Sequence, residues 1–119
     1  MNWYLAKIVF RIICGDGDHL PQFDEQLRLI GANSKEDAFC KAQTMGKREQ
    51  ETFLNRKDQL VQWQFINVSE LYRLSELIDG AELYSRIEER ENVEAYIYTV
   101  NQKAENLFFS QTHQLLQLA

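Results

Sequence analysis

The strictest constraint in the sequence is the alternating pattern of its first segment, from Trp3 to Cys14. Every second residue from Tyr4 onward is apolar, whereas the residues between them mix apolar side chains with Lys7 and Arg11. Successive side chains of a strand point to opposite faces, so a period of two over this length indicates a central strand. We expect helices to cover one face of this strand and water to reach part of the other.

A second alternating segment, Gln22 to Ala32, follows the turn-forming stretch Gly15 to Pro21, and the two segments predict a hairpin. The odd-numbered apolar residues of this second strand are expected to lie beneath the core face of the first: Phe23, Leu27 and Leu29. Arg28 then falls on the opposite face, near Val9.

Ser34 and the acidic residue three positions later predict the N-terminal cap of a helix. Gly46 is the expected C-cap of that helix, and residues 47–54 are expected to add another helical turn or two. The segment Leu60 to Val68 predicts a third strand, whose apolar positions change phase and indicate a bulge near Phe65.

Residues 69–80 fit either an extension of the third strand or a short helical connection. The alternation from Glu82 to Glu88 predicts a fourth strand. Apolar residues then recur at spacings of three and four, which predicts a long helix over about residues 92–116. This helix is longer than a four-stranded sheet needs, so residues 107–119 are expected either to pack against a second copy or to fray.

Together these segments predict one α+β domain over residues 1–119, with a compact body up to about residue 106. The expected architecture is an antiparallel sheet of about four strands with helices on one face, in the order β-β-α-β-β-α.

The composition excludes several classes of protein. A net charge of -5 argues against a nucleic-acid partner. No apolar run is long enough to span a membrane, and Lys7 and Arg11 interrupt what a signal peptide would require. We therefore expect a cytoplasmic protein, in which Cys14 and Cys40 are small buried residues without a metal or redox role.

Few residues suggest chemistry. Asp16, Asp18 and His19 share one loop and are weak candidates for a cation site, against the alternative of a solvated turn. Glu25 is a candidate acid because its parity places it beside apolar residues, although an inward Glu near a strand end is more often a gatekeeper or the partner of a buried cation. The sequence holds no nucleophile elbow, P-loop or dinucleotide motif, so we expect no cofactor and favour a protein that is not an enzyme.

The aromatic and cationic residues instead suggest an interaction surface, because aromatics and arginine are enriched at protein interfaces. The predicted surface residues are Trp3, Lys7, Arg11, Trp63, Tyr84, Arg86, Leu107, Phe108, Leu115 and Leu118. The alternative is a partly covered sheet face that cation and aromatic contacts stabilise.

Three motifs carry a family resemblance: Trp-Tyr-Leu-Ala-Lys at 3–7, Phe-Asp-Glu-Gln at 23–26 and Asp-Gly-Ala-Glu-Leu-Tyr-Ser at 79–85. With them the chain resembles a family of small bacterial proteins classed as a domain of unknown function. The resemblance implies a compact α+β domain of the bacterial cytoplasm, and it implies no activity, cofactor or site residue.

Three functions are therefore considered. The first is a protein-binding domain that forms a homodimer through the end of its long helix. The second is an acidic inhibitor or immunity-type protein that binds a basic partner. The third is a small-molecule binder, with a pocket between the sheet and the long helix lined by Tyr4, Glu25 or Tyr96.

Overall fold

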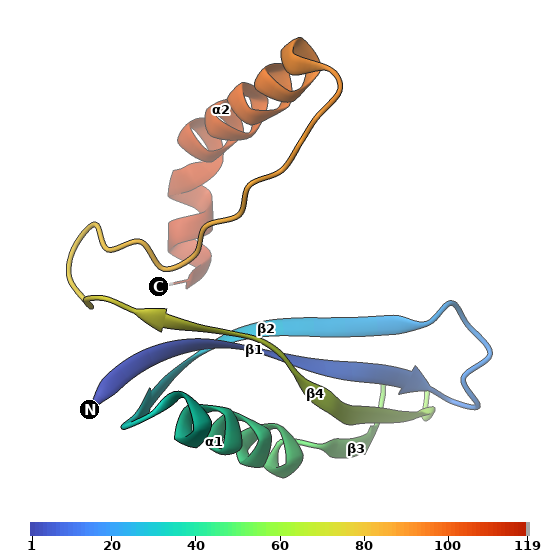
Figure 1. Ribbon diagram of the computed structural model, residues 1–119. Coiled ribbons are helices and arrows are strands. Elements are labelled where there is room, and N and C mark those ends of the chain that lie inside the picture. The colour runs from blue at the N-terminus through green and yellow to red at the C-terminus, as the bar shows by residue number, and fades with distance from the viewer. Residues whose placement is uncertain (119) are drawn as a thin grey trace. The chain divides into compact units, whose positions relative to one another are not determined.

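A four-stranded antiparallel sheet organises the chain, with strand order β2-β1-β4-β3 (Figure 1). The computed structural model describes the backbone of residues 1–118 and the side chains of residues 1–109. The elements are β1 (Asn2–Cys14), β2 (Gln22–Ala32), α1 (Lys35–Arg48), β3 (Glu51–Leu54), β4 (Leu60–Leu74) and α2 (Val93–Leu118). The predicted α+β class and the order β-β-α-β-β-α are confirmed.

The chain divides into two units, Met1–Ser85 and Arg86–Ala119. The first unit contains the sheet and α1, and the second contains α2. The expectation that residues 1–119 form one domain stays a prediction.

Helix α1 begins where the sequence predicts. The hydroxyl of Ser34 accepts a hydrogen bond from the backbone N–H of Asp37 at 3.1 Å, which satisfies one of the free donors at the helix start. The helix does not end at Gly46, however, because it continues to Arg48. Gly46 is a buried residue inside the helix, so the prediction that it caps the C-terminus is wrong.

The main core lies between α1 and one face of the sheet. Even-numbered residues of β1 face the helix, as the alternation predicts, and small alanines of α1 let the helix approach closely. The buried core residues are Tyr4, Ala6, Ile8, Phe10, Ile30, Ala32, Ala38, Ala42 and Val68.

The predicted face of β2 is wrong. Tyr4 pairs with Ile30, so the even-numbered residues of β2 face α1 and the odd-numbered ones face away. Phe23 is consequently 57% exposed, and Leu27 and Leu29 are exposed beside it. The cause is the short connection between β2 and α1, which places Ile30 in the core just before the helix starts. Because successive side chains of a strand point to opposite faces, the other even-numbered residues of β2 then also face α1.

The phase change in β4 is confirmed as a bulge. The register with β1 shifts twice, between Lys7 and Ile8 and between Val9 and Phe10. At the second shift Val9 pairs with Asn67 and Phe10 with Phe65, which leaves one extra residue on β4 near Phe65.

Residues 51–54 form a strand, so the helical turn predicted there is wrong. A polar turn joins this strand to β4: Asn55 accepts hydrogen bonds from the N–H groups of Lys57 and Gln59, at 2.8 and 3.0 Å. Asp58 adopts φ 59°, which suits such a turn. The local hairpin thus overrides helix propensity over these four residues.

The connection after β4 is resolved as a partial extension of the strand. β4 continues to Leu74, and residues 81–90 have no regular secondary structure. The predicted strand over Glu82 to Glu88 is therefore wrong. The side chains of residues 82–88 are exposed, so the alternation of apolar and polar residues in this segment does not mark a buried face.

The predicted long helix is present as α2. Asn92 caps it, since its side-chain oxygen accepts a hydrogen bond from the N–H of Ala95 at 2.9 Å. Over the described residues, no helix has the length and apolar character needed to cross a bilayer.

Candidate functional site

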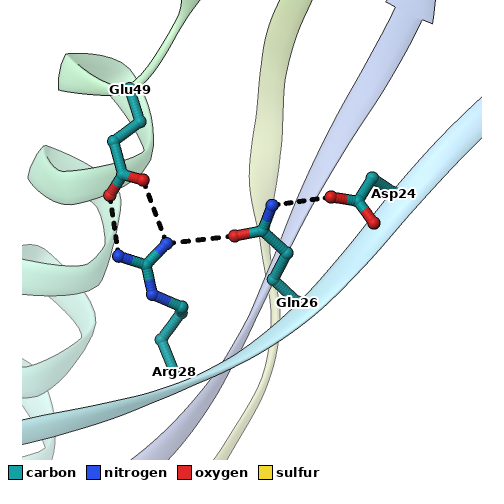
Figure 2. A network of polar contacts seen from close by, with 4 residues as sticks. All are labelled: Asp24, Gln26, Arg28 and Glu49. Atoms are coloured by element: carbon teal, nitrogen blue, oxygen red, sulfur yellow. Dashed lines mark hydrogen bonds and ion pairs between the residues drawn. The ribbon is translucent and has the colours of Figure 1, made fainter. Parts of the chain in front are cut away.

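Four polar side chains form a continuous chain of contacts on the α1 face of the sheet (Figure 2). Arg28 donates to both carboxylate oxygens of Glu49, at 3.0 and 2.9 Å. It also donates to Gln26 Oε1 at 3.0 Å, and Gln26 Nε2 donates to Asp24 Oδ2 at 2.6 Å. This series of hydrogen bonds fixes the orientation of Gln26 and joins the edge strand β2 to the C-terminal end of α1.

A hollow of about 370 Å³ lies beside this polar chain. Its lining consists of Phe10, Gln26, Glu49, Glu51, Phe53 and Trp63. These residues come from β1, β2, the C-cap of α1, β3 and β4, so the hollow depends on the tertiary fold.

The hollow exists because α1 is shorter than the strands it covers. Its 14 residues extend about 21 Å, whereas the 13 residues of β1 extend about 43 Å. The sheet therefore continues past Arg48, and α1 does not extend over the aromatic side chains beyond that point. Phe10 and Trp63 meet there with ring centroids 6.1 Å apart and an interplanar angle of 55°.

The opposite face of the sheet carries a second polar group, centred on Glu70. Lys7 Nζ lies 2.6 Å from one oxygen of Glu70, and the Tyr72 hydroxyl donates to the other at 2.8 Å. The hydrogen bond to Glu70 raises the pKa of Lys7, although partial burial opposes this. The pKa of Tyr72 is also raised, mainly by its hydrogen bond to Glu70 and secondly by its own partial burial.

The predicted interaction residues of the first unit lie on both faces of the sheet. Trp3, Lys7 and Arg11 do share the face away from α1. Trp63 lies on the other face, where it packs against the core. Tyr84 lies against the face away from α1, where its ring packs edge-to-face on Tyr72 with 5.6 Å between the ring centroids.

The remaining predicted surface residues belong to the second unit. Arg86 forms an ion pair with Glu88, whose pKa is lowered mainly by its hydrogen bond with Arg90. Leu107 and Phe108 are exposed on α2. The side chains of Leu115 and Leu118 lie outside the described residues.

The loop with the weak cation candidates is explained by backbone contacts. Asp16 accepts a hydrogen bond from the N–H of Asp18 at 3.1 Å. His19 Nε2 accepts from the N–H of Cys14 at 3.0 Å, and its Nδ1 lies 2.8 Å from the Leu20 carbonyl oxygen. Over the part of the chain that is described, no group of three or more metal-ligating side chains gathers.

The other single-residue expectations are corrected. Glu25 is exposed on the face away from α1, opposite Val9, whereas Tyr4 is buried on the α1 face. Tyr4 and Glu25 therefore lie on opposite faces of the sheet and do not face a common pocket. Cys40 is exposed and Cys14 is only partly buried, so the expectation that both are buried is wrong.

Sequence reasoning missed Gln26, Glu49, Glu51 and Phe53. The available signal was the polar alternation Asp24, Gln26 and Arg28, which marks these residues as sharing a face. The opposite parity of the strand is more apolar, so the alternation alone favours the solvent side for these three residues.

The fold and the site define a small α+β domain whose antiparallel sheet carries α1 on one face and a lined hollow at the end of that helix. The chain belongs to the family described as "Domain of unknown function (DUF4288)", whose model matches residues 3–85. The match ends at the same residue as the first unit, so α2 lies beyond it. No curated protein and no solved structure matches the chain.

Proposed function

We propose that this chain is a non-enzymatic protein-interaction domain that forms a homodimer through α2. The observation that carries the proposal is the exposure of this helix. Every side chain described in α2, from Val93 to Phe109, is exposed. A helix that buries nothing in its own unit has an apolar side available for a partner.

The spacing of that apolar side favours a second copy as the partner. Its residues recur at intervals of four, three, four and three: Val93, Ile97, Val100, Ala104 and Leu107. A repeat of seven with two apolar positions is the seam of a coiled coil, in which each helix fills the holes of the other. The same surface then serves both copies, as a two-fold dimer requires.

Helix energetics support the same proposal. Most of the stability of a protein helix comes from packing its apolar side, and an isolated helix is marginal in water. Within its own unit the described part of α2 has an exposed apolar side, and pairing with a second copy would cover it.

We further propose a bacterial protein of the cytoplasm. The free state of both Cys14 and Cys40 agrees with a reducing compartment.

The test is sedimentation velocity of the full chain and of the variant Ile97→Glu, Leu107→Glu. We expect a dimer for the wild type and a monomer for the variant, because a buried carboxylate in the seam is costly. The matched control is Thr99→Glu, Gln102→Glu, which adds the same two negative charges away from the seam and is expected to leave the dimer intact. Equal masses for wild type and seam variant would contradict the proposal.

A further inference from the structure

The hollow at the end of α1 combines aromatic walls with carboxylates at its rim. Phe10 and Trp63 form the inner wall of the hollow. Phe10 also packs edge-to-face against Phe65, with 6.1 Å between the ring centroids. Phe53 is 40% exposed and forms the outer wall on β3. The indole is only half-buried, so part of its surface remains accessible from the hollow.

The rim carries more negative than positive charge. Arg28 occupies both oxygens of Glu49, and Gln26 links this pair to Asp24. For Glu51, by contrast, no hydrogen bond or ion pair of the side chain is found among residues 1–109. The lining thus holds two carboxylates, of which Glu49 is paired with Arg28, and the carboxylate of Glu51 is left able to accept hydrogen bonds from a ligand.

This chemistry is complementary to a planar cation. A guanidinium group stacks on aromatic rings and donates two parallel hydrogen bonds to one carboxylate. An ammonium group makes no bidentate contact of this kind. The volume of about 370 Å³ is in the range of ligand-sized pockets and accepts one arginine side chain.

We propose that the hollow binds the arginine side chain of a partner protein, with the guanidinium between Trp63 and the carboxylate of Glu51. A net charge of -5 favours association with a basic partner. All lining residues belong to the unit Met1–Ser85, so the proposed site is built from that unit and contains no residue of α2.

The experiment is an NMR titration of the full chain with N-acetyl-arginine N-methylamide, followed through the two indole N–H signals. Trp63 lines the hollow, whereas Trp3 lies on the other face of the sheet and serves as an internal control. We expect the Trp63 signal to shift and the Trp3 signal to stay. The citrulline analogue has the same shape without the charge and is expected to bind at least about tenfold more weakly.

A pair of variants tests the assigned carboxylate. Glu51→Gln is expected to weaken binding of the arginine probe about tenfold. Glu36→Gln changes the net charge equally on an exposed part of α1 outside this hollow and is expected to leave binding unchanged. An unshifted Trp63 signal, equal binding of the citrulline analogue, or equal effects of the two variants would each overturn the proposal. Tighter binding of free arginine than of the capped probe would overturn the assignment to a protein partner, because it would indicate a small-molecule site.

Discussion

Gly46 lies directly against the ring of Phe65, and a Cβ atom at Gly46 would be 2.4 Å from two atoms of that ring. Real Cβ contacts are never so short, so this position in α1 excludes every other residue unless the ring moves. The absence of a side chain lets α1 settle on the bulged part of β4, where Phe65 faces the helix. The glycine is thus required by packing, although a helix interior normally disfavours it.

Replacing Gly46 by Ala tests this contact. Alanine is favoured over glycine in a helix by about 1 kcal/mol, but overpacking costs about 1 to 3 kcal/mol. We expect a net loss of free energy of unfolding, measured by urea denaturation. The same substitution in a Phe65→Leu background is expected to be neutral or stabilising. A stabilised Gly46→Ala protein would show that the ring has room to move.

The register of β2 predicts opposite results for two phenylalanines. Phe10 is 2% exposed, so Phe10→Ala is expected to cost about 3 to 5 kcal/mol. Phe23 lies on the exposed face, so Phe23→Ala is expected to cost less than about 1 kcal/mol. Chemical denaturation of both variants provides the comparison. Similar large losses in both would mean that β2 presents its odd-numbered residues to the core after all.

The Arg28 and Glu49 pair is expected to contribute modestly, because both side chains are partly exposed. Exposed ion pairs are worth about 0.2 to 1 kcal/mol, and the bidentate geometry places this one near the upper end. A double-mutant cycle with Arg28→Gln and Glu49→Gln measures the coupling free energy. Strict additivity of the two substitutions would refute a direct interaction between them.

The cluster around Glu70 predicts a pH dependence at high pH. In the folded chain the pKa values of Lys7 and Tyr72 are raised above their ordinary values of 10.5 and 10.0, so both groups hold their protons more tightly. The unfolded chain therefore loses these protons first as the pH rises. The stability they contribute is fully present below about pH 10 and is lost as the pH passes through the raised values.

The measurement is the free energy of unfolding between pH 8 and 11 for the wild type and Glu70→Gln, a range that spans both ordinary values. We expect a steeper decline in the wild type, because the substitution removes the main cause of both shifts. Parallel curves would show that Glu70 does not control these two groups.

Local patterns made much of the fold predictable. The alternation of β1, the Ser34 cap and the apolar repeat of α2 each depend on residues close in sequence. The bulge near Phe65 was also predictable, because a phase change in an alternating strand has few other causes. Likewise, the family resemblance came from short motifs within residues 3–85.

The rest depends on contacts that a local pattern does not contain. Alternation separates the two faces of β2 but does not say which face α1 covers, so the face holding Phe23 was misassigned. β3 is only four residues long, and its pairing with β4 outweighs its own propensity. The hollow was not predictable, since it arises from the end of α1 at Arg48 and from side chains of distant segments.

Native mass spectrometry of the intact full chain tests the central claim most directly, because it counts the subunits of each species from its mass. Pairing through α2 predicts a species at twice the 14.1 kDa mass of the chain, which persists on dilution into the low micromolar range and is lost in the Ile97→Glu, Leu107→Glu variant. A wild-type chain that remains at 14.1 kDa at every concentration would contradict self-association through α2.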